Sequence, residues 1–349
     1  MIAAGSAVQR PPDAKLLVID SHRNITHVPR ATFVEFLRPK DLVIANDAAT
    51  LPASLSGLHE ETHNPIEVRL AGRPSLDHLN VGRFSAIVFG EGDFHVRTED
   101  RPLPPVLKSE DRLKLGPLRA TVERLLGHPR LISLLFSGSP DEVWAGLAQH
   151  GRPIQYSHIQ TPLALWDVWT RIAGLPTAFE PPSASFVLDW HLLSAIRERG
   201  ATFATITHAA GISSAGDEEL DRLLPFDEPY RIPKPTARAV DLVRSRGGRV
   251  IAVGTSVVRA LEDAALGNGR LRSGEGLAKQ RIGAASQLRI VDAILSGTHE
   301  PGTSHYELLR AFLEDSTLRH ATEELSARGY RTHEFGDSVL IERGPLHSE

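Results

Sequence analysis

The strongest constraint on the fold is a strand, turn and helix pattern in residues 247–262. Residues 250–253 form an apolar, mostly β-branched run, which is the kind of strand that a sheet covered on both faces requires. Gly254 frees the backbone to turn, and Thr255 and Ser256 open the helical pattern that follows. A buried strand that passes directly into a helix is typical of an α/β fold.

The same turn carries the first functional signal. The first amides of a helix have no partners within the helix, so its amino end favours anions and sugar hydroxyls. The hydroxyls of Thr255 and Ser256 would add further polar contacts there. An ordinary turn in which Ser or Thr caps the helix explains the same residues. The local sequence leaves both interpretations open.

Composition narrows the possible functions. The chain has 349 residues, of which 41% are hydrophobic and 23% are charged, as in globular proteins that can bury a core. It contains no cysteine, which excludes disulfides, thiolate nucleophiles and cysteine-ligated metals. The net charge of −4 gives no overall preference for nucleic acid, although local basic patches remain open. We find neither a signal peptide nor a membrane-spanning segment, so we expect a cytoplasmic protein without membrane contact or disulfide partners.

The order of the predicted elements indicates two domains. Residues 16–20, 42–45, 201–206 and 338–341 are predicted strands, whereas residues 31–37, 162–173, 187–199, 236–246 and 286–296 show helical spacing. Short strand-like runs, among them 66–70, 84–89, 94–97 and 113–119, lie between these groups. We therefore expect an α/β domain of residues 1–60 and 157–349, with a β-rich domain of residues 61–156 inserted into it.

Four separated segments resemble one family in order. These are residues 41–47, 250–262, 290–295 and 330–341, and the most specific piece is the Gly-Gly-Arg-Val-Ile-Ala-Val-Gly-Thr of residues 247–255. They resemble the S-adenosylmethionine:tRNA ribosyltransferase-isomerases of queuosine biosynthesis. The resemblance implies a large, barrel-like α/β domain with an all-β barrel domain inserted.

The resemblance also implies a reaction. In that family the ribosyl group of S-adenosylmethionine, a co-substrate, is joined to a 7-aminomethyl-7-deazaguanine in the tRNA anticodon stem-loop. Rearrangement of the sugar then releases adenine and methionine. A sulfonium leaving group needs little acid assistance, so the protein must position the amine, assist removal of a ribose proton and polarise the adenine. Hydroxyls, amides and a few carboxylates meet these demands, and no metal is expected.

Some signature motifs of the family are altered here. The family histidine in Pro-Thr-Ala-Gly-Leu-His-Phe corresponds to Val187, and a second histidine is shifted by one position to His208. In a third motif His299 is kept, while the family lysine corresponds to Gly302. The alternative is therefore a paralogue that binds S-adenosylmethionine or a related nucleoside and acts on a small-molecule acceptor.

The resemblance and the local chemistry select ten candidate site residues. Arg259 has an alternative interpretation, a surface ion pair with Glu262, because the two are three positions apart on a helix. The expected catalytic residues are His299, Glu228 and Asp337, and the expected S-adenosylmethionine-binding residues are Gly254, Thr255, Ser256, Arg259, Ser183, Ser185 and Gly211.

Two other patterns have competing interpretations. His59 to His63 match the zinc-protease motif His-Glu-x-x-His, but the neighbouring Gly57 and Pro65 leave no room for its long helix. A polar loop between domains is the expected alternative. The aromatic side chains of Trp166, Trp169, Trp190 and Phe186 would either stack on a base or pack in the core.

Overall fold

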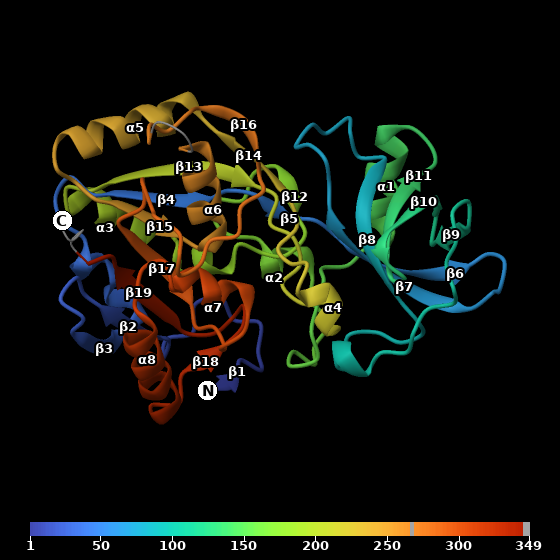
Figure 1. The fold of residues 1–349 in the computed structure, drawn as a ribbon, viewed down its shortest axis with the longest axis horizontal. Coiled ribbons are helices and arrows are strands. Elements are labelled where there is room, and N and C mark those ends of the chain that lie inside the picture. Colours follow the sequence, from blue (N-terminus) through green and yellow to red (C-terminus); the bar gives the residue numbers. More distant parts are fainter. Residues whose placement is uncertain (266–268, 345–349) are drawn as a thin grey trace.

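The computed structural model describes residues 1–265 and 269–344, in which a nine-stranded sheet lies beside a closed six-stranded barrel (Figure 1). The predicted α/β domain with an inserted β-barrel is confirmed. The sheet of the larger domain has two free edges, β16 and β3, so it is open rather than barrel-like. Among the described residues, none of the helices has the length and apolar character needed to span a membrane.

The large sheet is mixed, with four parallel strands at its centre. Neighbouring strands β13, β4, β15 and β17 are parallel, which brings their carboxyl ends to one edge of the sheet. In spatial order the strands are β16 (Gly274–Ala278), β14 (Glu228–Ile232), β13 (Thr202–His208), β4 (Leu42–Asn46), β15 (Val250–Val253), β17 (Ala293–Gly297), β19 (Ser338–Glu342), β2 (Lys15–Ile19) and β3 (Ile25–Pro29).

Both faces of this sheet are buried, because successive side chains of each central strand point to opposite sides. In β4, Leu42 and Ile44 belong to one core, and Val43 and Ala45 belong to the other. The first core is shared with α5 (Lys234–Ser245), α6 (Thr255–Ala264), α7 (Ser304–Leu309) and α8 (Asp315–Ala327). The second is shared with α3 (Trp190–Glu198) and two 3-10 helices, Arg30–Phe36 and Ser183–Val187.

The inserted barrel is antiparallel throughout. Its strands are β6 (Ser54–His59), β7 (Pro65–Gly72), β8 (Arg83–Phe89), β9 (Arg112–Leu115), β10 (Leu118–His128) and β11 (Leu131–Phe136). Val143 and Leu147 of α1 (Pro140–His150) pack into its core. Because β6 is a barrel strand, the insertion begins before the predicted boundary at residue 61.

The remaining described elements are short. They are β1 (Ile2–Ala3), which pairs with β18 (Arg331–Thr332), β5 (Ala49–Thr50), which pairs with β12 (Pro176–Ala178), and the short helices α2 (Leu165–Val168), α4 (Glu218–Asp221) and Thr98–Asp100.

Three element predictions were wrong. Residues 286–296 contain β17 rather than a helix. A short run of buried apolar residues fits a helix or a strand equally well, and here pairing with the neighbouring strands makes it a strand. The helix expected over residues 162–173 is limited to the single turn of α2. Residues 94–97 form a turn, in which the Asp93 side chain accepts the His95 N–H at 2.9 Å, instead of a strand.

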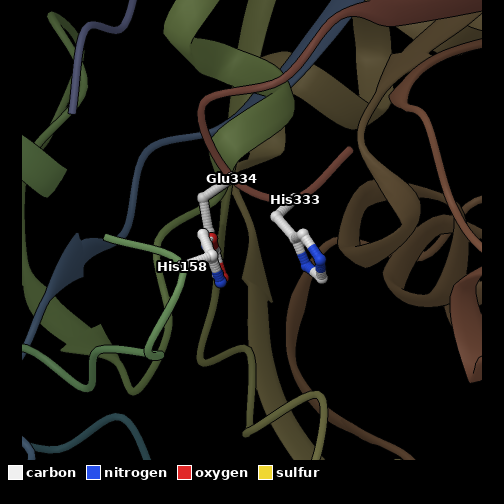
Figure 2. A group of neighbouring side chains, drawn as sticks. All are labelled: His158, His333 and Glu334. Carbon is white, nitrogen blue, oxygen red and sulfur yellow. Dashed lines mark hydrogen bonds and ion pairs between the residues drawn. The ribbon is translucent and has the colours of Figure 1, made fainter. Parts of the chain in front are cut away.

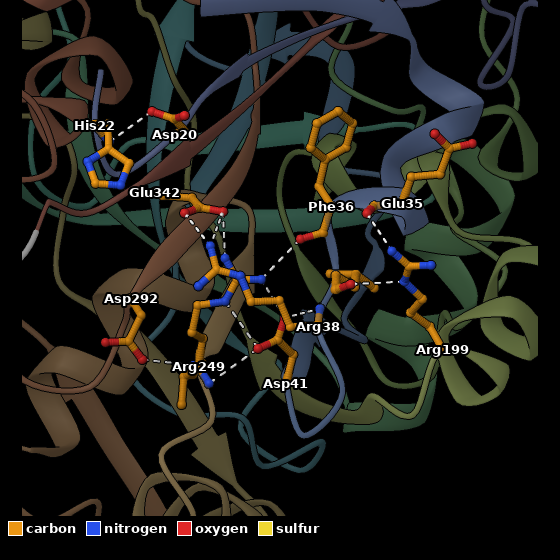
Figure 3. Close-up of polar contacts among 12 residues, drawn as sticks. Asp20, His22, Glu35, Phe36, Arg38, Asp41, Arg199, Arg249, Asp292 and Glu342 are labelled. Atoms are coloured by element: carbon orange, nitrogen blue, oxygen red, sulfur yellow. Dashed lines mark hydrogen bonds and ion pairs between the residues drawn. The ribbon is translucent and has the colours of Figure 1, made fainter. Parts of the chain in front are cut away.

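Charged side chains join the amino ends of β4 and β15 (Figure 3). Arg249 donates to Asp41 at 2.5 Å and to Glu342, the last residue of β19, at 2.5 Å. Arg38 also donates to Glu342, at 3.0 Å. Asp41 and Arg249 both belong to the motifs that carry the family resemblance. These two motif residues therefore fasten three strands at the end of the sheet opposite the carboxyl ends of β4 and β15.

Candidate functional site

A pocket of about 250 Å³ lies at the carboxyl ends of the parallel strands. Ligands of open α/β sheets bind at this edge, where the loops leave the strands. We call it the central pocket. Five of the ten predicted site residues line it: Gly211, Glu228, Thr255, Ser256 and Arg259. Its other walls include Ala210, Ile212, Asp221, Arg222, Leu224, Pro225, Arg281, Ile282, Gly302, Ser304, His305, Glu307 and Leu308.

The amino end of α6 opens into the central pocket. Gly254 precedes the helix with φ 97° and ψ 155°, a conformation open essentially only to glycine. No side chain caps the helix, so the interpretation of this turn as a capped turn was wrong. Thr255 and Ser256 line the pocket beside the unpaired first amides. The Nδ2 of Asn46, at the end of β4, donates to the Ser256 hydroxyl at 3.4 Å and helps to hold the Ser256 side chain in place.

Glu228 accepts three hydrogen bonds in the wall of the pocket. It accepts hydrogen bonds from the His208 ring Nε2 at 2.8 Å, from the Gly211 amide at 2.6 Å and from Arg259. Burial acts to raise the pKa of Glu228, but the Arg259 charge, the His208 ring and the Gly211 amide hold it at about 2. Glu228 is therefore ionised and is held by three hydrogen bonds, which suits a positioning role; its expected acid–base role stays a prediction.

Arg259 is buried and is not part of a surface ion pair with Glu262. Besides its pair with Glu228, it donates to the carbonyl oxygens of Ala278 at 3.0 Å and Phe226 at 3.2 Å. Glu262 is also buried and accepts three backbone N–H groups of residues 289–291, at 2.7 to 2.9 Å. Both residues thus fix the loops around the pocket to α6, and the surface-pair alternative was wrong.

Residue 211 has to be a glycine because its backbone lies very close to the Glu228 carboxylate. A Cβ at this position would lie 3.0 Å from the Glu228 Oε1 and 3.1 Å from the carbonyl oxygen of Ala71. The absence of a side chain lets the Gly211 amide reach the carboxylate at 2.6 Å. Gly211 lines the central pocket, and its role in binding S-adenosylmethionine stays a prediction.

His305, rather than His299, lines the central pocket. The two rings stack with centroids 4.8 Å apart, and the His299 Nε2 lies 2.8 Å from the Ser296 hydroxyl. Burial lowers the pKa of His305, so its ring is neutral at pH 7. Burial and the neighbouring His305 lower the pKa of His299 well below its usual value. His299 therefore packs against the ring of His305 and does not line the central pocket, and its expected catalytic role stays a prediction.

Asp337 does not line the central pocket. Its carboxylate accepts the backbone N–H groups of Lys15 and Arg331, each at 2.8 Å, and pairs with the Arg331 side chain at 3.3 Å. It thereby joins the beginning of β2 to the turn before β19. These contacts give Asp337 a structural role, and its expected catalytic role stays a prediction.

Ser183 and Ser185 lie in a 3-10 helix behind the turn at Gly254. A Cβ on Gly254 would lie 3.4 Å from the Cβ of Ala184, so this helix contacts the turn without lining the pocket. Ser185 is fully buried. Phe186 is buried against Phe335, with ring centroids 5.3 Å apart, and does not fill the pocket.

The tryptophans of the same region are on the surface. The exposed fractions are 77% for Trp166, 41% for Trp169 and 73% for Trp190, so the expected core packing was wrong for them. None of the three lines the central pocket.

The His-Glu-x-x-His segment forms the turn between β6 and β7. His59 is buried and contacts Thr62 at 2.9 Å and Asp111 at 3.1 Å, while His63 is exposed with φ 56°. The two histidines do not share a helical face, which excludes the zinc-protease site. The segment is a polar loop as expected, but within the barrel and not between domains.

Asp47 and Glu180 are polar side chains near the site that the sequence alone did not select. Asp47, which follows β4, accepts the hydroxyls of Thr205 and Thr207 at 2.7 Å each. Glu180 is buried and accepts the Tyr156 hydroxyl. Burial raises the pKa of Glu180 to about 7, and the nearby charge of Glu334 acts in the same direction.

A basic cleft of about 630 Å³ lies where the barrel meets the large sheet. It shares Pro225 and Arg281 with the central pocket, so the two adjoin. Among the described residues that line it, Asp227 is the single acidic one, whereas five are cationic: Arg73, Arg83, Arg124, Lys279 and Arg281. We call this surface the basic cleft.

Comparison with known proteins gives one family over almost the whole chain. Residues 1–341 match the family described as queuosine biosynthesis protein. The S-adenosylmethionine:tRNA ribosyltransferase-isomerase of Trichlorobacter lovleyi is 31% identical, with 98% of this chain and 96% of the relative covered. The protein of the same name from Synechococcus elongatus is 30% identical, with 97% and 92% covered.

A solved structure, described as S-adenosylmethionine tRNA ribosyltransferase from Thermotoga maritima, matches with a TM-score of 0.49 and 22% identity, covering 97% of this chain and 94% of that one. The family match and the two curated relatives settle the assignment without it. The chain belongs to the queuosine biosynthesis protein family.

Proposed function

We propose that this protein transfers the ribosyl group of S-adenosylmethionine to the amine of 7-aminomethyl-7-deazaguanine in tRNA and rearranges it. Its relatives are named S-adenosylmethionine:tRNA ribosyltransferase-isomerases, and the resemblance described above implies the acceptor base. The observation that carries the proposal is the uncapped amino end of α6 in the central pocket, built by the motif that is most specific to the family. Family membership over residues 1–341 supports the same reaction.

The central pocket supplies groups that suit this co-substrate. The free amides of α6, with the hydroxyls of Thr255 and Ser256, bind a carboxylate or ribose hydroxyls. The neutral ring of His305 is the group best placed in the pocket wall to accept a ribose proton. Glu228 and Arg259 neutralise each other and keep the wall rigid. The sulfonium leaves as neutral methionine thioether, which needs no acid.

The basic cleft supports a tRNA substrate. Phosphates bind where several Lys and Arg side chains meet, and this surface adjoins the pocket in which the modified base would react. We assign the cleft to the anticodon stem-loop and place the reaction in the cytoplasm, where tRNA is available. A small-molecule acceptor in place of tRNA stays a prediction from sequence that no contact of the described residues favours.

The test is adenine release. The protein is incubated with S-adenosylmethionine and a tRNA that carries 7-aminomethyl-7-deazaguanine, and adenine and methionine are measured by liquid chromatography. We expect one adenine per modified tRNA and none with tRNA that retains guanine. His305→Ala should lower the rate by at least ~100-fold, the usual range for a lost general base.

Two results would contradict the proposal. Adenine release that is independent of tRNA would indicate a different acceptor. Failure of calorimetry to detect binding of S-adenosylmethionine at millimolar concentration would remove the co-substrate altogether.

A further inference from the structure

A second cluster of side chains lies outside the central pocket, between the segment that leaves the barrel and the turn before β19. It consists of His158, His333 and Glu334, and we call it the His158 cluster. Figure 2 shows the three side chains converging from these two segments. None of them has a part in the proposed ribosyl transfer.

The three side chains offer ligand atoms at short range. The His158 Nε2 lies 3.0 Å from the Glu334 Oε2, and the rings of His158 and His333 stack with centroids 4.3 Å apart. One nitrogen of each ring and one carboxylate oxygen all lie within 4.8 Å of one another. In a tetrahedral site with bonds of about 2.0–2.1 Å, ligand atoms are roughly 3.3 Å apart. Because the two rings are stacked nearly parallel, an ion would have to rotate the imidazoles towards each other to reach that spacing.

The backbone holds the ligands of the turn in place. His333 has φ 68°, an unfavourable conformation for a residue with a Cβ, and its carbonyl oxygen accepts the Gly336 N–H at 3.0 Å. His158 is held from its other side by a stacked contact with Tyr156, with parallel rings 6.2 Å between centroids. The ring of His333 is exposed, while His158 and Glu334 are half-buried. An ion can therefore enter from solvent and retain a water at its open position.

We propose that His158, His333 and Glu334 bind one divalent transition-metal cation of the zinc type. Two imidazoles and one carboxylate are a donor set that suits Zn²⁺ and Co²⁺, with water as the fourth ligand. Mg²⁺ and Ca²⁺ prefer oxygen ligands and do not suit it. The inference is independent of the proposed function, whose central pocket has other residues.

A second group, His59, Glu61 and Asp111, has a similar set of ligand types within the barrel. The Nδ1 of its single histidine already contacts the Thr62 hydroxyl at 2.9 Å, and Glu61 is exposed. One imidazole also gives weaker selection for Zn²⁺ than two. This group serves as the internal comparison for the proposed site.

The experiment measures metal binding directly. Full-length protein without a histidine tag is treated with chelator, dialysed and titrated with Co²⁺ and then Zn²⁺ alone by calorimetry, while the cobalt absorption spectrum is recorded. We expect one ion per chain at micromolar or lower concentration, a tetrahedral cobalt spectrum that Zn²⁺ abolishes, and a higher melting temperature, because the ion joins two separate segments. Mg²⁺ should not compete.

Variants assign the ligands. His333→Ala should weaken Zn²⁺ binding by at least ~10-fold, since even the loss of an outer partner of a metal ligand has that effect. Glu334→Gln provides a second variant of the same shape, and circular dichroism confirms folding of each. His95→Ala is the matched control, because His95 forms an exposed histidine–carboxylate pair with Asp93 at 2.8 Å.

Three outcomes would overturn the assignment. These are the absence of Co²⁺ or Zn²⁺ binding at micromolar concentration, binding that is unchanged in both His333→Ala and Glu334→Gln, and binding that His59→Ala abolishes while His333→Ala leaves it intact.

Discussion

At the scale of single residues, the carboxylate of Glu228 determines the electrostatics of the central pocket. It balances the buried charge of Arg259, and both are nearly inaccessible to water. A buried pair of this kind contributes little compared with apolar packing, but the loss of one partner leaves an uncompensated charge. Glu228 is therefore sensitive to substitution even by an isosteric neutral side chain.

We predict that Glu228→Gln lowers the free energy of unfolding by about 3 kcal/mol at pH 7, because Arg259 loses its counter-ion. The folded pKa of about 2 lies below the ordinary value of 4.5, so the contribution is complete above about pH 5 and is lost as the pH falls towards 2. Urea unfolding of both proteins from pH 7 to pH 3 should show the difference shrinking with acid.

Glu218→Gln is the control for this measurement, since the Glu218 side chain is 89% exposed in α4. It should change stability by less than ~0.5 kcal/mol at every pH. A difference for Glu228→Gln that does not shrink between pH 5 and pH 3 would contradict the assigned pKa.

At the scale of elements, the turn from β15 into α6 combines a special backbone conformation with an uncapped helix end. Gly254 has φ 97°, and the first amides of α6 are open to the central pocket. A helix end of this kind loses stability that a cap would supply, so its retention is consistent with a ligand that takes the place of the cap.

We predict that Gly254→Ala destabilises the protein more than Gly247→Ala. Gly247 follows α5 with φ 68°, in the left-handed region, and its added Cβ would meet nothing within 4 Å. Gly247→Ala should lower the free energy of unfolding by about 1 kcal/mol. Gly254→Ala should lower it by about 2–3 kcal/mol, because the conformation of Gly254 is open essentially to glycine alone. Chemical denaturation of the two variants compares these losses, and equal values would exclude special strain at Gly254.

A carboxylate introduced at the amino end of α6 tests whether this helix end binds S-adenosylmethionine. Ser256→Asp should reduce the affinity for S-adenosylmethionine at least tenfold, because the new charge takes up the free amides and repels the ligand carboxylate. Ser316→Asp places the same charge at the second residue of α8, away from the pocket. Both variants should retain stability within ~1 kcal/mol, and equal affinities by calorimetry would argue against the site.

At the scale of the whole molecule, the barrel and the large sheet form a surface that neither has alone. Arg73, Arg83 and Arg124 come from the barrel domain, and Lys279 and Arg281 follow β16 of the sheet. Their positive charge adjoins the central pocket although the net charge of the chain is −4. Local charge therefore permits RNA binding where the overall composition gives no preference for it.

We predict that Lys279→Glu weakens tRNA binding and leaves the affinity for S-adenosylmethionine unchanged. The slope of log affinity against log salt should fall by about 1, as for one lost phosphate contact. Arg319→Glu on α8, which lies away from the barrel in Figure 1, is the charge-matched control. Filter binding across a salt series measures both, and equal slopes would remove tRNA from the basic cleft.

The sequence predicted the parts of the fold that depend on residues close together along the chain. The strand, turn and helix of residues 250–262 have a local pattern, and the structure has them as β15 and α6. The sequence did not predict β17, because its apolar residues fit a helix or a strand until a sheet surrounds them.

The same distinction applies to the site. His299 and His305 are both suitable by residue type, and only the path of the loop before α7 decides that His305 lines the pocket. Asp337 has a family motif position, but its role follows from distant strand ends that meet in the fold. The His158 cluster likewise joins residues 158 and 333, which no local pattern connects.

The separation of paired strands along the chain has a consequence for synthesis on the ribosome. All six barrel strands find their partners within residues 54–136, whereas β2 pairs with β19, which begins at Ser338. Domains fold as units while translation proceeds, and distant pairings form late. We expect arrested nascent chains to gain a protease-resistant barrel first, while β2 has only its neighbour β3 as a partner until almost the entire polypeptide has emerged and β19 can pair with it.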